Sequence, residues 1–264
     1  MLKHADHLRV VLVGTRNPLN LGAAARAMSN FGFLQLRVVN PYEVAFREAR
    51  SAVGAAAPLL AAAEEFTSVA DAVADCTLVV GTTAVRHREL QHPLRRLEYG
   101  AQLIKRELAA GRVALVFGTE KTGLSNDDLS HCQWLMRIPT REQHISMNLG
   151  QAVAVCLYEL ARDLKQARVG ADLRSSSSAA AARPSSPART ASELSGKRVT
   201  AAEMERISSV LLEALERSGY INPIAQANTQ ERVRRMVRRL NLSSQDAELW
   251  LGMLRQMLWK IRTG

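Results

Sequence analysis

The stretch Asn17-Pro-Leu-Asn-Leu-Gly-Ala-Ala-Ala-Arg26 decides how this chain folds. It follows a short apolar run at residues 10–13 and opens an alanine-rich pattern with the period of a helix. Similar apolar runs and helical patterns alternate over the first 164 residues. The sequence therefore predicts an α/β fold with a mainly parallel sheet.

Five apolar runs are the candidate strands, and each is rich in Val, Leu or Ile, as expected for strands buried on both faces. They cover residues 9–14, 35–40, 77–81, 113–118 and 134–138. The predicted helices cover residues 21–30, 43–54, 69–74, 97–110, 126–132 and 148–162. Ser125, followed by Asp128 three residues later, is a capping pattern that supports the start of one helix.

A segment rich in Ser, Ala and Pro at residues 174–189 has no aromatic or β-branched residue, which is typical of a flexible linker. After it, Thr200 with Glu203, and Ser243 with Asp246, form capping patterns of a helical region. Its predicted helices run from 200 to near 219, from 230 to 240 and from 244 to 261. The predicted divisions are an α/β domain over 1–168, a linker over 169–198 and a small helical domain over 199–264.

Composition narrows the class of protein. Hydrophobic residues make up 47% of the 264 residues, enough for a packed core. No apolar run approaches the ~20 residues that cross a bilayer, and residues 1–10 lack the apolar centre of a signal peptide. We therefore expect a cytoplasmic protein. Cys76, Cys132 and Cys156 are far apart and match no metal-ligand spacing, so we expect reduced, buried thiols and no metal.

The net charge of +10 is unevenly distributed. Residues 1–164 carry 18 basic and 16 acidic side chains, or +2; residues 165–190 carry 5 and 1, or +4; residues 191–264 carry 12 and 8, or +4. Because +8 of the +10 lies in the last hundred residues, the charge favours a polyanionic partner such as a nucleic acid. Solubility alone is the alternative explanation.

Arginines cluster in one predicted helix of the C-terminal region. At about 100° per residue, Val233, Met236, Val237 and Leu240 fall on one face, which we expect to pack against a neighbour. Five arginines fall on the opposite face, where they would form a phosphate-binding stripe. They are Arg232, Arg234, Arg235, Arg238 and Arg239. A merely solvated face is the alternative, although five arginines without an interleaved acid repel one another.

Two further segments are candidate functional motifs, in addition to residues 17–26. Phe117-Gly-Thr-Glu-Lys-Thr-Gly-Leu124 directly follows a predicted strand, and ligands of open α/β sheets lie at the carboxyl ends of strands. Ser146-Met-Asn-Leu-Gly150 precedes an apolar helical pattern. Taken alone, the first is equally a plain turn and the second a helix cap. The chain has no Gly-x-Gly-x-x-Gly after its first strand and no P-loop, which disfavours a Rossmann dehydrogenase and a P-loop NTPase.

In this order, the three segments resemble the signature motifs of the SPOUT RNA methyltransferases of the SpoU type, over about residues 8–164. The resemblance implies a parallel sheet with a deep C-terminal trefoil knot, S-adenosylmethionine as cofactor, and an RNA ribose 2′-hydroxyl as methyl acceptor. It also implies a homodimer, in which first-motif residues reach the partner's cofactor site. The enzymes that this chain resembles most modify tRNA at nucleotide 32 of the anticodon loop and carry a helical extension.

The family's cofactor-binding positions fall on three strand-end loops and on the third motif of this chain. These positions are Thr82, Thr83, Ala84, Gly118, Ile138, Ile145, Ser146 and Met147. An apolar pocket with backbone donors suits an adenine ring.

The resemblance assigns the chemistry to Asn20 and Arg26 of the first motif. Glu120, Ser146 and Asn148 would orient groups around the ribose hydroxyl, and each also has a purely structural alternative. Because a guanidinium stays protonated, we expect Arg26 to hold a phosphate and stabilise the developing alkoxide rather than to act as a base.

Two other functions stay open at this point. An enzyme of the same superfamily that acts on ribosomal RNA differs from a tRNA enzyme only in what its C-terminal region binds. A non-catalytic RNA-binding protein would keep the basic region, but the retained motif residues argue against it. His144, in a charged loop segment, is more often incidental than functional and is left out of the candidate set.

Overall fold

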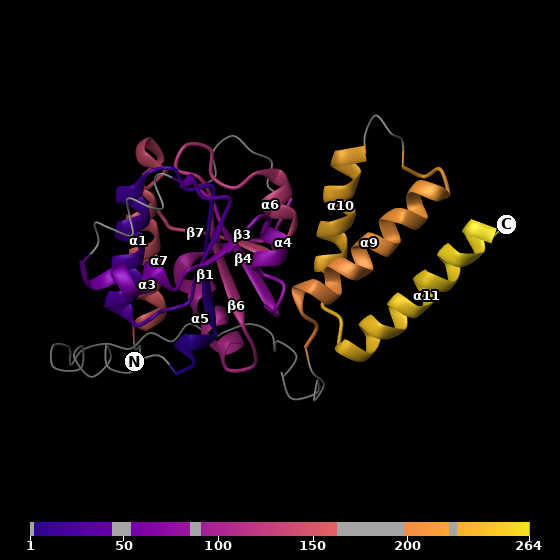
Figure 1. Cartoon of the computed structure of the whole chain (residues 1–264), viewed down its shortest axis with the longest axis horizontal. Helices are drawn as coiled ribbons and strands as arrows, with labels where there is room; N and C mark the ends of the chain where they lie inside the picture. The colour runs from indigo at the N-terminus through magenta and orange to yellow at the C-terminus, as the bar shows by residue number, and fades with distance from the viewer. Residues whose placement is uncertain (1–2, 44–53, 85–90, 163–197, 222–225, 264) are drawn as a thin grey trace, which may run out of the picture.

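The computed structural model describes residues 3–43, 54–84, 91–162, 198–221 and 226–263. Within these residues, helices flank one sheet (Figure 1), and its seven strands have the order β3-β2-β1-β6-β4-β7-β5. All its neighbouring strands pair in parallel. The strands are β1 Leu8–Val13, β2 Leu36–Val39, β3 Glu64–Phe66, β4 Leu78–Thr82, β5 Leu94–Arg96, β6 Val113–Phe117 and β7 Trp134–Arg137.

Two apolar clusters cover the two faces of the sheet. One packs the strands against α1, α5 and α7, and the other packs them against α4 and α6. Because both faces are covered, β1 and β6 are buried at every residue, which explains their continuous apolar sequences. The helices of this part are α1 Pro18–Phe31, α3 Ala57–Ala61, α4 Val69–Ala72, α5 Leu97–Leu108, α6 Asn126–Ser130 and α7 Leu149–Ala161, with short 3-10 helices η1 Ala5–His7, η2 Gly54–Ala56 and η3 Glu142–His144.

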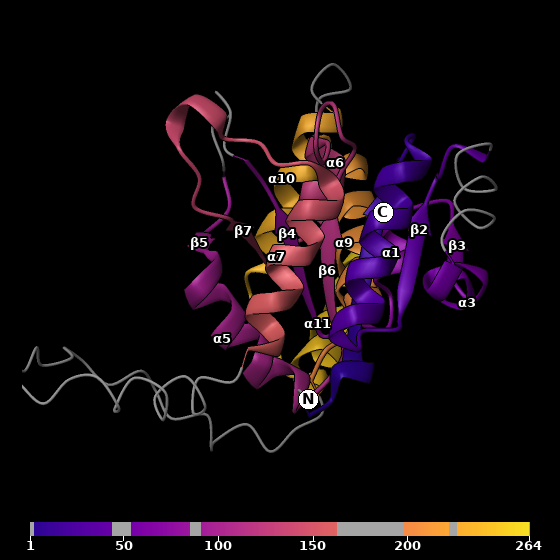
Figure 2. The ribbon, with the colours of Figure 1, turned by 90° about the vertical axis from the view of Figure 1, so that its left-hand side faces the viewer.

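The ends of α1 follow from its sequence. The side chain of Asn17 accepts a backbone N–H of the first turn, Pro18 takes the first helical position, and Gly32 ends the helix at a φ of 76°. α1 and α7 lie side by side on one face of the sheet (Figure 2). They approach closely, since a Cβ added at Gly150 would stand 2.5 Å from the Cβ of Ala23. This packing brings the first and third sequence motifs together.

The C-terminal region is a unit of three helices, α9 Ala201–Arg217, α10 Gln226–Arg238 and α11 Ser244–Thr263. The three share an apolar core of their own. The unit packs on the α4 and α6 side of the sheet (Figure 1). Ala201 is buried in the cluster on that face, and its N–H donates to the carbonyl of Cys76 at 2.8 Å. The predicted caps at Thr200 and Ser243 are confirmed.

The structure confirms the predicted parallel sheet and the helical C-terminal region. The sequence analysis missed β3, β5 and α3, which have only three to five residues each. The predicted helix over 43–54 and the linker over 169–198 fall almost entirely outside the described residues. Threading of the chain as a knot and the three domain boundaries stay predictions. Among the described residues, no helix is both long and apolar enough to cross a membrane.

Candidate active site

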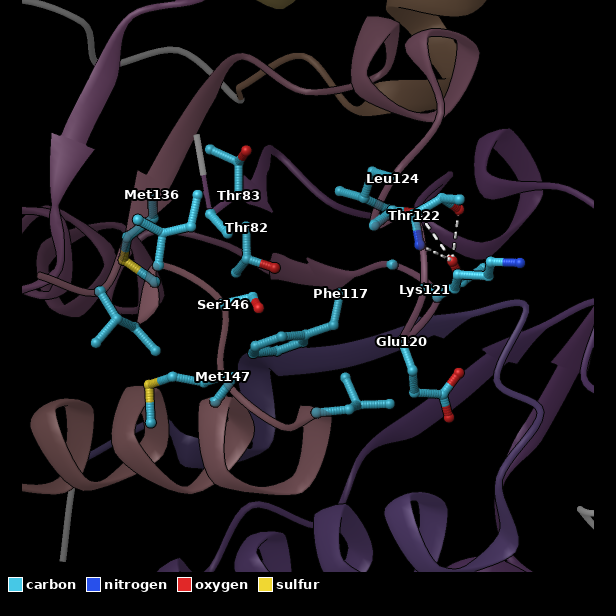
Figure 3. A pocket seen from close by; sticks show the side chains of 18 of the residues that line it. Thr82, Thr83, Phe117, Glu120, Lys121, Thr122, Leu124, Met136, Ser146 and Met147 are labelled. Carbon is cyan, nitrogen blue, oxygen red and sulfur yellow. Dashed lines mark hydrogen bonds between the residues drawn. The ribbon is translucent and has the colours of Figure 1, made fainter. Parts of the chain in front are cut away.

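A cavity of about 380 Å³ opens where the carboxyl ends of β4, β6 and β7 meet (Figure 3). The strand order places these three strands side by side, so the loops that follow them lie at one edge of the sheet. All eight predicted cofactor positions line this cavity: Thr82, Thr83, Ala84, Gly118, Ile138, Ile145, Ser146 and Met147. The structure thus brings them together, and their binding role stays a prediction.

The wall also includes side chains that the sequence reasoning did not single out. Leu129 comes from α6, and Ala152 and Cys156 come from α7. No local pattern signals these three residues, because only tertiary packing turns those helices toward the strand ends. Leu124 and Met136, in contrast, are close in sequence to predicted positions and could have been included.

The loop after β6 folds back on itself. The backbones of Thr119 and Gly123 exchange hydrogen bonds of 3.2 and 2.9 Å. A Cβ at Gly118 would stand 2.1 Å from the carbonyl carbon of Gly123, so no larger residue fits there. Gly123 has room for a Cβ, but its φ of +71° is a left-handed backbone conformation that favours glycine. The second motif therefore needs one glycine for space and the other for backbone conformation.

The lining of the cavity is mostly apolar, with a few polar groups. Thr82 and Ser146 point toward its centre, and Glu120 lies at one end (Figure 3). The Thr82 hydroxyl donates to the carbonyl of Val116 at 3.0 Å, which fixes that side chain. A cavity of this size and character suits a small organic molecule such as a nucleoside derivative.

Three of the predicted catalytic residues form a hydrogen-bonded chain beside the cavity. The amide Nδ2 of Asn148 donates to Oδ1 of Asn20 at 2.6 Å, and Nδ2 of Asn20 donates to Oε1 of Glu120 at 3.1 Å. Glu120 also accepts the backbone N–H groups of Asn17 and Arg16, at 3.2 and 3.4 Å. The side chain of Asn148 also accepts a backbone N–H at the start of α7. The residue therefore caps that helix and contacts Asn20 at the same time.

These contacts set the ionisation of Glu120. Partial burial acts to raise its pKa, but hydrogen bonds from its own backbone, from Asn20 and from the backbone of Asn17 and Arg16 outweigh burial. The pKa of Glu120 therefore lies below its ordinary value. A carboxylate that is hard to protonate is a poor proton acceptor near neutral pH. The hydrogen bond from Asn20 to Glu120 holds the Asn20 amide in one orientation.

Ser146 and Arg26 lie in different surroundings. Ser146 lines the cavity, and its loop is held by the Thr140 hydroxyl, which donates to the carbonyl of Ile145 at 3.2 Å. Arg26 is exposed on α1, six residues after Asn20, and is not among the residues that line the cavity. Asn20 and Asn148 are also outside the lining, but they are hydrogen-bonded to Glu120, which lies in it; Arg26 is not part of that hydrogen-bonded chain.

The predicted exposed stripe of five arginines is wrong. Arg235 and Arg238 are only 8% and 2% exposed, whereas Met236, expected to pack inward, is 44% exposed. The helical projection assumed one neighbour, but α10 packs against both α9 and α6, so that two faces are covered. Of the five arginines, Arg232 and Arg239 remain exposed.

The other three arginines are bound by the protein itself. Arg238 donates to the carbonyl of Ala201 at 3.0 Å and to Glu205 at 3.1 Å. Arg235 donates to the side chain of Gln91 at 2.7 Å. Arg234 also contacts Glu205 and reaches α6. A buried guanidinium is found where such acceptors surround it, which a helical projection of α10 alone does not include.

The chain is similar to known RNA methyltransferases in sequence and in structure. A model of the SpoU rRNA Methylase family matches residues 7–158. The tRNA (cytidine/uridine/adenosine-2′-O-)-methyltransferase TrmJ of Pseudomonas aeruginosa is 34% identical, covering 94% of this chain and 93% of that protein. The tRNA (cytidine/uridine-2′-O-)-methyltransferase TrmJ of Sodalis glossinidius is 33% identical, covering 94% and 90%. The crystal structure of TrmJ from Z. mobilis matches with a TM-score of 0.75 at 28% identity, covering 94% and 98%.

Proposed function

Because the chain belongs to the SpoU rRNA methylase family, we propose that it transfers a methyl group from S-adenosylmethionine to the 2′-hydroxyl of a tRNA ribose. The observation that carries the proposal is one cavity lined by all eight expected cofactor positions, with the hydrogen-bonded chain of Asn148, Asn20 and Glu120 beside it. The choice of tRNA is supported by relatives named as tRNA methyltransferases, whose match extends over 94% of this chain. The proposed target is nucleotide 32 of the anticodon loop, as cytidine or uridine.

The cavity fits the cofactor in size and in lining. Its volume of about 380 Å³ lies within the range of pockets that bury small organic ligands. Leu124, Leu129 and Met136 offer apolar surface for an adenine ring. The cofactor supplies an electrophilic methyl group, so the protein has mainly to align the ribose hydroxyl with it.

Asn20 is the residue that we assign to the ribose hydroxyl. Its amide nitrogen donates to Glu120 and its amide oxygen accepts from Asn148, so both ends of the amide are held. One N–H and one lone pair of Asn20 remain for substrate. Ser146 adds a hydroxyl from the cavity wall. A fixed amide and a hydroxyl orient a nucleophile without having to rearrange during the reaction.

In this proposal the protein is a homodimer, and Arg26 of one protomer reaches the cavity of the other. The outer faces of α1 and α7 carry exposed apolar side chains, with Leu19 77% and Tyr158 54% exposed. Phe31 and Tyr158 stack edge to face at 6.1 Å between ring centroids and join these two helices. A second copy covering this surface would bring its own α1, and with it Arg26, to the neighbouring cavity. There the guanidinium would hold the target phosphate in a bidentate contact.

The test is methylation of tRNA by the purified chain, with the methylated nucleotide mapped by mass spectrometry. Arg26→Ala should lower turnover by about 10²- to 10³-fold while the affinity for S-adenosylmethionine stays within about twofold. Arg106→Ala, which removes an exposed arginine of α5, is the matched control. Methylation of ribosomal RNA in place of tRNA would support the alternative substrate. RNA binding without any methyl transfer would refute the enzymatic proposal.

Mixing two inactive variants tests the contribution of Arg26 across the dimer. Thr83→Trp places a large ring in the cavity, whereas Arg26→Ala leaves the cavity intact. In a mixed dimer, one cavity is intact and faces an intact Arg26. About a quarter of wild-type activity should return after subunit exchange, since half the dimers are mixed and each has one working site. No recovery, with exchange demonstrated, would place Arg26 in the site of its own chain.

The exposed arginines of α10 are the proposed tRNA contacts of the C-terminal region. Replacing Arg232 and Arg239 by Gln should weaken tRNA binding and reduce the slope of log affinity against log salt by roughly 0.7–0.9 for each phosphate that is no longer neutralised. A filter-binding series across salt concentrations measures both effects. An unchanged slope would remove these two residues from the RNA-binding surface.

A further inference from the structure

The short helix α6 lies beside α10 (Figure 1), and it also forms part of the cavity wall. On one side, Leu129 of α6 and Leu124 just before it form part of the cavity wall. On the other side, Asp127 and Ser130 contact α10. A helix of five residues is not stable by itself, so the position of α6 depends on what it packs against.

Arg234 of α10 is one of those partners. Its Nη1 donates to Oδ1 of Asp127 and to Oγ of Ser130, both at 3.0 Å, and its Nε donates to Oε1 of Glu205 at 3.0 Å. The side chain of Arg234 is 15% exposed, whereas that of Asp127 is 70% exposed. The bonds to buried Ser130 and to Glu205 are therefore less screened by water than the ion pair with Asp127. One guanidinium joins α6, α9 and α10.

A second contact of α10 reaches the segment before β5. Arg235 donates to the side chain of Gln91 at 2.7 Å, and His92 follows Gln91 directly in the chain. Burial, followed by the positive charge of Arg235, lowers the pKa of His92 to about 4, so its ring is neutral at pH 7. Consecutive arginines of α10 thus contact α6, which carries Leu129, and the segment before β5.

We propose, building on the proposed function, that Arg234 is a positioning residue for the cofactor cavity and acts through Ser130 and Asp127 of α6. The residue lies outside the part of the chain that the family model matches, residues 7–158. The C-terminal region therefore has two roles: the outer side of α10 faces the RNA, and its inner side holds one wall of the cofactor cavity. Loss of the inner contacts lets α6 shift, and Leu124 and Leu129 then no longer form a fixed surface.

The test compares Arg234→Gln with Arg206→Gln in the full-length protein. Both changes remove one positive charge from the C-terminal region, but Arg206 is exposed on α9. Calorimetric titration with S-adenosylmethionine, without RNA, measures the dissociation constant and the fraction of binding-competent protein separately. Arg234→Gln should raise the dissociation constant roughly three- to tenfold, which lies within the range of coupling through a packed network. Arg206→Gln should leave it unchanged.

A merely structural role of Arg234 predicts a different result, in which the competent fraction falls while the dissociation constant stays at the wild-type value. That outcome would overturn the proposal. If Arg234→Gln does not fold, Ser130→Ala removes the buried acceptor of the same guanidinium and should raise the dissociation constant by a smaller factor. An unchanged constant in that variant would also overturn the proposal. A folded wild-type protein that binds no S-adenosylmethionine would instead refute the proposed function.

Discussion

Replacing Gly118 by Ala adds one methyl group at the tightest point of the cavity wall. The new Cβ would stand 2.1 Å from the carbonyl carbon of Gly123, 2.2 Å from the nitrogen of Leu124 and 2.5 Å from the carbonyl oxygen of Gly123. All three neighbours are backbone atoms, so no side chain can rotate to make room. The loop over residues 118–124 must open, and the hydrogen bonds between Thr119 and Gly123 must lengthen or break.

Gly123→Ala is the matched control, because it adds the same methyl group to the same loop. A Cβ there meets nothing within 4 Å, but the φ of +71° is unfavourable for Ala. We expect Gly123→Ala to lower the free energy of unfolding by about 1 kcal/mol. Gly118→Ala should lower it by about 3 kcal/mol, the upper end of overpacking effects, because rigid backbone must move.

Two measurements on both variants check these values. Urea unfolding gives the change in the free energy of unfolding, and calorimetry with S-adenosylmethionine gives the effect on the cavity. Gly118→Ala should bind the cofactor at least about tenfold more weakly, whereas Gly123→Ala should stay within about threefold. Equal effects of the two substitutions on both measurements would refute the reasoning, since they would show that the close approach at Gly118 does not shape the cavity.

Three other predictions follow from individual residues. Because the pKa of Glu120 is lowered on folding from its ordinary 4.5, its contribution to stability is present above that pH and is lost as the pH falls through the lower folded value. The stability difference between wild type and Glu120→Gln should therefore shrink in urea titrations below about pH 4.5. Burial raises the pKa of the thiols of Cys76, Cys132 and Cys156 to about 12 each. A thiol reagent should therefore label none of them in the native protein and all three in urea. Rapid labelling of the native protein would contradict this prediction. Gly252→Ala, in the exposed interior of α11, should raise the free energy of unfolding by about 0.5–1 kcal/mol in urea titrations, and a decrease would show a hidden contact.

Burial explains which strands the sequence could predict. β1, β2 and β6 are buried at every residue, so each reads as an apolar run and was found within one or two residues of its ends. β3 and β5 lie at the two edges of the sheet, and their residues are mostly exposed. Their pairing with a neighbour, rather than an apolar pattern, makes them strands. A method that reads hydrophobic patterns cannot find them.

Part of the candidate site could also be predicted from the sequence, and part could not. The loops after β4, β6 and β7 could be located because each follows a predicted strand, and parallel strands end at a common edge. The contact between Asn20 and Asn148 spans 128 residues and depends on the close packing of α1 on α7. The spacing of the two residues in the sequence does not show that their side chains are close together in space. The family resemblance supplied these residues, and the structure shows that their side chains are hydrogen-bonded to each other.

The arginines of α10 show why a charge pattern alone does not identify an RNA-binding surface. Arg234, Arg235 and Arg238 bind acceptors from α6, α9 and the segment before β5, so their charge is largely taken up within the protein. Only the side of α10 with Arg232 and Arg239 is open to phosphate. A truncated chain that ends before α9 should therefore lose more than the proposed RNA contacts. It would also expose the sheet-side surface around Cys76 and remove the contacts from α10 to α6, so we expect truncation to weaken the proposed cofactor binding as well as the proposed RNA binding.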